Sequence, residues 1–296
     1  MRLSVTIEPN LGGETSMQER IITKETIKAF GAYLLREEKS AATTEKYLRD
    51  VRSFAEYLGG AEVSKAEVIR YKSALAGRYR ARSINSVLAS LNSLFAFRGW
   101  HDCRVRSVKL QRQIFCPEEK ELTREEYTRL CRAAQERHNE RLYLILQTIC
   151  GTGIRVSELR FITVEAVRRG EATVTLKGKT RTVLIVRALQ KKLLRFASAH
   201  GIDRGMLFVT RTGKPISRTN VWREMKALCC AAEVNPSKVF PHNLRHLFAR
   251  VFYGIEKDIA KLADILGHAS IDTTRIYIVS TGAEHRRRME HMHLIL

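Results

Sequence analysis

Hydrophobic residues recur at helical spacing through the first third of the chain. One run falls at i, i+4, i+7 and i+11, which is one face of a helix: Tyr47, Val51, Phe54 and Leu58. Ser40 can cap this helix and Gly59-Gly60 can end it. A second face ends before Gly99 and consists of Ile84, Leu88, Leu91 and Phe95. With shorter helices near residues 26–36 and 65–76, this pattern predicts a helical bundle over residues 22–104, after a flexible lead-in of residues 1–21.

The hydrophobic period changes in the second half of the chain. Residues 105–121 have no clear period and hold Pro117 and many charges, so they are the predicted linker. The predicted second domain, residues 122–296, opens with a capping box of Thr123 and Glu126 and a buried helix that ends at Gly151. Apolar residues then alternate with polar ones on both sides of a basic turn, residues 177–180, which predicts a β-hairpin. Helices resume near residues 188, 219, 242, 257 and 271. The expected fold class is mainly α with a small β-sheet.

The charge balance indicates a polyanionic partner. Among 296 residues, 52 are Lys or Arg and 31 are Asp or Glu, a net charge of +21. The basic residues are scattered through both halves, which favours nucleic acid over an anionic membrane. No apolar run is long enough to span a bilayer, and residues 1–20 do not resemble a signal peptide, so we expect a cytoplasmic protein without membrane contact. The 6 cysteines form no C-x-x-C pair, which argues against a zinc site.

Several residues of the second domain suit chemistry on a phosphodiester. Guanidinium groups hold its anionic oxygens, and cleavage needs a nucleophile and a proton donor. Glu158 follows a glycine-rich turn and an arginine that it could hold. Each residue alone is an ordinary surface or core side chain, but their order within one basic domain predicts an active site. In chain order they are Arg155, His242, Arg245, His268 and Tyr277.

These residues lie in motifs that resemble the tyrosine recombinase (phage-integrase-like) family, with an Xer-like arrangement. The motifs are Gly-Thr-Gly-Ile-Arg155-Val-Ser-Glu158-Leu, Lys177 in a β-turn, His242-Asn-Leu-Arg245-His, Leu-Gly-His268 and Tyr277. The first domain resembles the core-binding domain of that family through Thr44, Tyr47, Phe54, Tyr57 and Leu58. The resemblance implies an N-terminal helical core-binding (SAM-like) domain and a C-terminal α+β catalytic domain, which together form a C-shaped DNA clamp.

The resemblance also implies a role for each catalytic residue. Tyr277 would attack the scissile phosphate and form a 3′-phosphotyrosine, while Arg155 and Arg245 clamp the non-bridging oxygens. Lys177 would protonate the leaving 5′-oxygen, a role that Lys179 could take after a small shift of the turn. His242 would assist proton transfer at the tyrosine, and His268 would donate a hydrogen bond to the phosphate. One ester is exchanged for another, so neither ATP nor a metal or other cofactor is expected.

The expected partner is double-stranded DNA with specific recombination sites. Nine basic residues are candidates for DNA contacts: Arg78, Arg80, Arg82, Arg104, Arg106, Lys109, Arg112, Lys179 and Arg250. The C-terminal tail has an apolar portion, Met289 to Leu296, that a lone domain would expose. By resemblance, this tail would dock on a neighbouring subunit, giving a homo-oligomer with a dimer on each site and a tetramer in the synapse.

The sequence is compatible with several biological functions. The sequence favours a recombinase that integrates or excises a mobile element, and chromosome dimer resolution would use the same core. One alternative is a type IB topoisomerase, which relaxes DNA by similar chemistry. Another is a DNA-binding regulator without catalysis. The helical first domain and the apolar tail favour the recombinase over the topoisomerase, and the intact catalytic set argues against the regulator.

Overall fold

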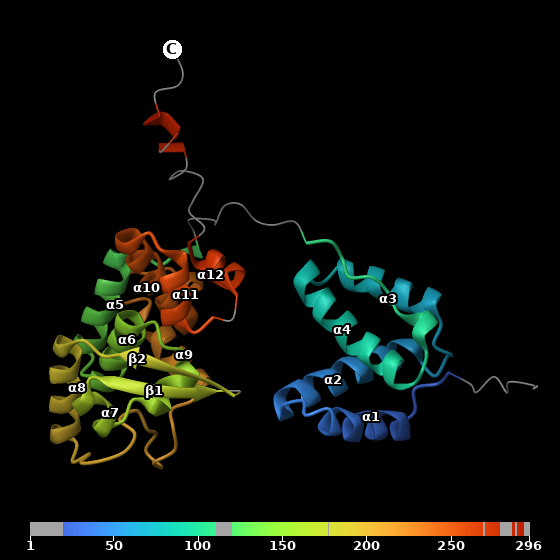
Figure 1. Ribbon diagram of the computed structural model, residues 1–296, viewed down its shortest axis with the longest axis horizontal. Coiled ribbons are helices and arrows are strands. Elements are labelled where there is room, and N and C mark those ends of the chain that lie inside the picture. The colour runs from blue at the N-terminus through green and yellow to red at the C-terminus, as the bar shows by residue number, and fades with distance from the viewer. Residues whose placement is uncertain are drawn as a thin grey trace, which may run out of the picture. The chain divides into compact units, whose positions relative to one another are not determined.

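The chain folds into two compact units, Met1–Arg112 and Gln113–Leu296. The computed structural model describes residues 20–110, 120–176, 178–268, 270–278, 286–287 and 289–292 (Figure 1). The division between the units falls inside the predicted linker. Within the described ranges, no helix combines the length and the apolarity that crossing a lipid bilayer requires.

Unit 1 is a small helical bundle. Its elements are α1 (Lys24–Arg36), α2 (Ala41–Leu58), α3 (Lys65–Ala76), α4 (Ala81–Phe97) and the 3₁₀ turn η1 (His101–Cys103). The predicted caps of α2 are confirmed: the Ser40 side chain accepts a hydrogen bond from the Thr43 N–H, and Gly59 ends the helix at φ +59°. Phe30, Phe54 and Phe95 are fully buried in the core between these helices.

The segment after η1 is fastened along α4 by two asparagine side chains. The Asn92 amide donates to the Val105 carbonyl (3.0 Å) and its oxygen accepts from the Val105 N–H (3.2 Å). Asn85 does the same for Val108, at 2.9 and 2.7 Å. Asn85 and Asn92 are two helical turns apart, and Val105 and Val108 are three extended residues apart. Both separations are about 10 Å, so each asparagine lies opposite its partner. Residues 105–108, the start of the predicted linker, therefore have a fixed course on unit 1.

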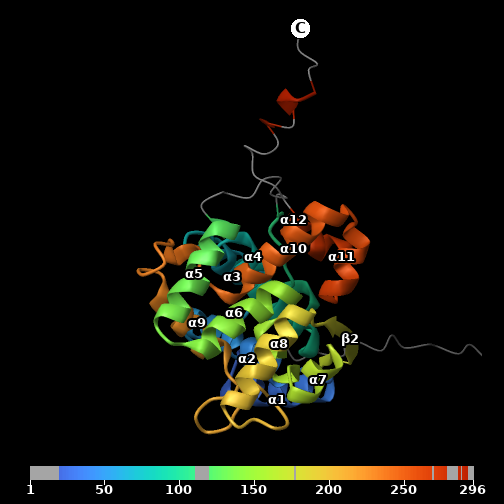
Figure 2. The ribbon, with the colours of Figure 1, turned by 90° about the vertical axis from the view of Figure 1, so that its left-hand side faces the viewer.

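Unit 2 combines helices with a single hairpin in its described part. Its elements are α5 (Arg124–Glu136), α6 (Glu140–Thr152), η3 (Val156–Phe161), α7 (Val164–Arg169), β1 (Glu171–Leu176), β2 (Lys179–Leu184), α8 (Arg187–Ala199), α9 (Arg218–Leu228), η4 (Pro236–Lys238), α10 (Pro241–Glu256), α11 (Ile259–Leu266) and α12 (Ile271–Ile278). In both views, α10, α11 and α12 lie together at one end of the unit (Figures 1 and 2).

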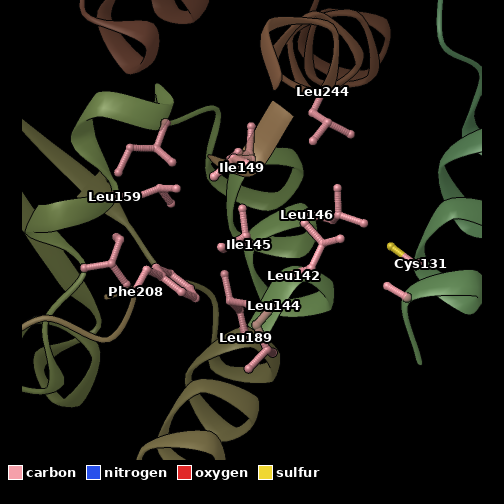
Figure 3. Packing of buried hydrophobic residues seen from close by; sticks show 14 of the residues in the cluster. Cys131, Leu142, Leu144, Ile145, Leu146, Ile149, Leu159, Leu189, Phe208 and Leu244 are labelled. Atoms are coloured by element: carbon pink, nitrogen blue, oxygen red, sulfur yellow. The ribbon is translucent and has the colours of Figure 1, made fainter. Parts of the chain in front are cut away.

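Helix α6 is the centre of the unit 2 core. Figure 3 shows its apolar residues meeting side chains from α5, η3, α8 and α10, among them Cys131, Leu159, Leu189 and Leu244. The capping box predicted for Thr123 and Glu126 is present at the start of α5.

The C-terminal end of α6 differs from the sequence prediction. The helix does not end at Gly151 but continues to Thr152, and Gly153 is its cap at φ +65°. The Gly153 N–H donates to the Ile149 carbonyl (2.9 Å), which continues the helical bonding through Thr152. A Cβ on Gly153 would lie 2.5 Å from the Phe248 ring. Both the backbone conformation and the lack of space therefore require glycine here, two residues before Arg155.

The predicted hairpin is also present. β1 and β2 are antiparallel, with Ala172 paired to Val183 and Val174 paired to Arg181. Ala172, Val174 and Val183 are buried, so Arg181 belongs to the core-facing side of the hairpin. Two residues separate the strands, and the second, Gly178, has φ +73°. The first, Lys177, lies outside the described residues.

Candidate active site

Arg245 on α10 is the buried centre of the site, with only 1% of its surface exposed. Its guanidinium donates to the carbonyl of Gly153 at the end of α6 and to the carbonyl of Leu266 at the end of α11 (2.7 Å). Its Nη2 also lies 2.9 Å from Nε2 of His268. The buried Nε has no hydrogen-bond partner among the residues that the structure describes. Arg245 therefore ties two helix ends together, and not all of its five N–H donors are used by these contacts.

Tyr277 on α12 lies against the same helix. Its hydroxyl is 3.2 Å from Nε2 of His242, and its ring stacks on His246 with centroids 4.2 Å apart. The guanidinium carbon of Arg245 lies 5.8 Å from the ring centroid. Tyr277 is 6% exposed and packs with Leu262 and Leu266. The predicted nucleophile, the predicted proton acceptor and a predicted phosphate clamp thus meet within one unit.

His268 is fixed from both ring nitrogens. Nδ1 lies 2.8 Å from the hydroxyl of Thr274, and Nε2 faces Arg245. Because a guanidinium can only donate, Nε2 accepts and Nδ1 carries the proton. The hydrogen bond predicted from His268 to a phosphate would require a proton on Nε2 and a shift of Arg245 away from it.

Arg155 is held by Glu158, as the sequence suggested. The carboxylate accepts from the Arg155 N–H (2.8 Å) and from its Nη1 (2.8 Å). Burial alone would raise the pKa of Glu158, which is 1% exposed. The hydrogen bond from the Arg155 backbone and the charge of Arg181 outweigh burial, so the pKa is lowered and the carboxylate is charged at neutral pH.

The imidazoles of the site are neutral at neutral pH. Burial and the neighbouring His242 lower the pKa of His246 to about 4. Burial and the charge of Arg245 lower the pKa of His268 to about 4 and also lower that of His242. Burial and the charge of Arg155 lower the pKa of Arg245 to about 10, which leaves it protonated. The site therefore combines charged guanidinium groups with neutral histidines, and a neutral His242 can accept a proton.

The lowered histidine pKa values predict a loss of stability in acid. A histidine that is neutral in the folded state and titrates near pH 6.5 when unfolded destabilises the fold progressively as the pH falls from about 6.5 to about 4. For His246 the full effect is about 3 kcal/mol. Urea unfolding at pH 7 and pH 4.5 measures it. In His246→Phe, which keeps an aromatic ring on Tyr277, the acid sensitivity should be smaller, and an unchanged sensitivity would contradict the assignment.

The other predicted residues have different positions. Lys177 and Arg112 lie outside the described residues, and Lys179 begins β2. On unit 1 the remaining candidates for DNA contacts are all exposed: Arg78, Arg80, Arg82, Arg104, Arg106 and Lys109. Arg250 instead pairs with Glu121 and donates to the Leu122 carbonyl (2.6 Å), which ties α10 to the chain before α5.

Three residues of the site were not among the sequence candidates: Arg181, His246 and Thr274. His246 was visible only as the end of the motif that contains Arg245. The alternation of apolar and polar residues in β2 could have identified Arg181. It precedes Val183 by two residues and Ile185 by four, so it lies on the same buried side of the strand. Within the described part of the chain, no group of His, Cys, Asp and Glu side chains is arranged to hold a metal ion.

Comparison with known proteins agrees with this fold. Residues 120–284 match the phage integrase family, and residues 27–101 match its N-terminal SAM-like domain. The tyrosine recombinase XerA of Pyrococcus furiosus is 30% identical over 290 residues, which cover 94% of this chain and 98% of XerA. XerA of Thermococcus kodakarensis is 31% identical, with 92% and 96% covered.

A solved structure has the same fold at low identity. A lambda integrase dimer bound to a core site has a TM-score of 0.70 at 17% identity and covers 86% of this chain and 95% of its own. The chain belongs to the phage integrase family. It is a tyrosine-type, site-specific DNA recombinase with a SAM-like domain ahead of its catalytic domain.

Proposed function

We propose that this recombinase cleaves double-stranded DNA at specific sites through Tyr277 and rejoins it to a new partner strand. The observation that carries the proposal is the contact between the Tyr277 hydroxyl and Nε2 of His242, 3.2 Å apart, beside the buried Arg245. A neutral His242 takes the tyrosine proton as the phenolic oxygen attacks the phosphorus. Arg155 and Arg245 offset the charge that develops on the non-bridging oxygens.

The second half of the step releases the 5′-oxygen. The bond between phosphorus and the 5′-oxygen breaks, and Lys177 supplies the proton, with Lys179 as the alternative donor. A 3′-phosphotyrosine and a free 5′-hydroxyl result. The 5′-hydroxyl of a second duplex then attacks the phosphotyrosine, Tyr277 regains its proton, and the number of phosphoester bonds is unchanged.

The proposed assembly is a dimer on each site and a tetramer in the synapse. Its support is the exposure of apolar tail residues: Met289 is 69% exposed and Met292 is 57% exposed. Packing these side chains against a neighbouring subunit would remove their apolar surface from water. The proposed biological role is integration or excision of a mobile element, which the family description and the similarity to lambda integrase support.

The test is covalent capture from a pool of DNA duplexes. Each duplex has a random central sequence and a nick that lets the cleaved fragment diffuse away, so the covalent complex accumulates. After denaturation, protein-linked strands should carry the protein at a 3′ end and share a common inverted repeat. Recombination between two such sites on a plasmid supports the proposal. Relaxation of plasmids without a site indicates a topoisomerase, and binding without any adduct indicates a regulator.

The same plasmid assay tests the tail. A chain that lacks Met289 to Leu296 should bind a single site with wild-type affinity and recombine two sites poorly. Wild-type recombination by the truncated chain would remove the tail from the proposal and leave the chemistry intact.

A further inference from the structure

Arg181 connects three parts of the site from the core-facing side of β2. Its Nη2 donates to Oε2 of Glu158 (2.6 Å), and its Nη1 donates to the carbonyl of Ile265 near the end of α11 (2.7 Å). Its side chain is 12% exposed. The hairpin is thereby tied to the loop that carries Arg155 and to the turn that leads to His268.

The ion pair between Arg181 and Glu158 reduces the share of the Glu158 negative charge that Arg155 has to neutralise. The Glu158 carboxylate is almost completely buried and accepts from both arginines. A buried carboxylate needs a counter-charge. With Arg181 in place, Arg155 shares this task, and its side chain, 38% exposed, keeps donors available for a ligand. Without Arg181, Arg155 would be the one cation left on Glu158 among the described residues, and it would be held more tightly away from a phosphate.

The stem of Arg181 also shapes the turn before His268. A Cβ on Gly267 would lie 2.3 Å from the Arg181 Cδ, and Gly267 has φ +65°. The turn therefore packs directly on the arginine stem. The Arg181 Nε is buried without a hydrogen-bond partner among the described residues, which costs free energy. Maximum stability does not account for an arginine placed in this way.

We propose that Arg181 is a positioning residue of the active site. It neutralises Glu158, which leaves the Arg155 guanidinium available to the scissile phosphate, and it fixes β2 against the Arg155 and His268 loops. The inference rests on the proposed function, because it concerns how the phosphate clamp of that reaction is held. Arg181 itself acts through Arg155 rather than on the DNA.

The main experiment compares Arg181→Met with the wild type on two forms of the captured site. One form has an ordinary scissile phosphate. The other has a methylphosphonate there, in which a methyl group replaces one charged oxygen, so less positive charge is needed. On the phosphate, Arg181→Met should cleave about 100-fold more slowly, with DNA affinity changed by less than about threefold. On the methylphosphonate the defect should shrink to about tenfold or less.

Arg141 offers a matched control in the same unit. It also bridges a carboxylate and a carbonyl, with Nη2 on Glu224 (2.8 Å) and Nη1 on the carbonyl of Val209 (3.0 Å). Arg141→Met should lower the melting temperature as Arg181→Met does, yet cleave both substrates at near the wild-type rate. If the two variants lose activity alike, or if Arg181→Met is equally slow on both substrates, the proposal fails.

Two further variants keep the test decisive. Arg181→Lys retains the charge and should lose only about tenfold, and it replaces Arg181→Met if that variant does not fold. The double variant Arg181→Met with Glu158→Gln removes the charge that Arg181 neutralises and should recover about tenfold of the loss. No recovery would contradict the neutralising role. Wild-type protein that forms no adduct would instead overturn the proposed function itself.

Discussion

Tyr277→Phe is expected to abolish covalent capture of DNA while the protein keeps its fold and its affinity for the site. The substitution removes only the hydroxyl group, whose oxygen is the proposed nucleophile. The ring still fits against His246 and the apolar side chains of α11, because the packing there involves the aromatic face. The lost contact with His242 costs about 1 kcal/mol of stability. The cleavage rate should fall by at least about 10⁴-fold, as expected for loss of a nucleophile.

Measurement is by denaturing gel and by mass spectrometry of the linked peptide. Tyr253 on α10 provides the control, because it packs against the same cluster of residues. Tyr253→Phe should form the adduct at the wild-type rate. An adduct that persists in Tyr277→Phe would place the nucleophile on another residue.

Arg245→Met should have the second largest effect and should act on both activity and stability. It removes the donors that satisfy the Gly153 carbonyl, the Leu266 carbonyl and His268 in a buried place. Buried acceptors left without a donor cost about 1–3 kcal/mol each, and loss of a costly buried charge offsets part of this, so a net destabilisation of about 3 kcal/mol is expected. Cleavage should fall by about 10³-fold or more.

Arg155→Met is the informative comparison for this variant. Arg155 is partly exposed and is held through Glu158, so its loss should change stability by only about 1 kcal/mol. Its effect on cleavage should still reach about 10²- to 10³-fold. Urea unfolding and single-turnover cleavage of the captured site separate the two effects. Equal destabilisation by both variants would contradict the central structural position of Arg245.

Local signals in the sequence account for much of the fold. The cap residues Ser40 and Thr123, the glycine stops and the alternation in the hairpin all act within a few neighbours along the chain, so a sequence pattern can reveal them. The end of α6 was misplaced because two glycines stand close together. Only the left-handed conformation of Gly153 and the nearby Phe248 ring identify the true cap.

The site was predictable where a motif keeps its residues close in sequence. Glu158 lies within one turn of Arg155, and their pairing could be anticipated. Arg181 reaches Ile265 across 84 positions and Glu158 across 23. Contacts of this range depend on tertiary packing, which spacing along the chain does not encode.

The enclosure of Tyr277 has a consequence for the lifetime of the intermediate. Tyr277 is stacked on His246 and packed against Leu262 and Leu266, and the residue is only 6% exposed to solvent. An ester formed there is expected to resist hydrolysis until a DNA hydroxyl enters. The phosphotyrosine ester then conserves the free energy of the DNA phosphodiester that was broken. A reaction interrupted at this stage leaves a strand that can still be rejoined.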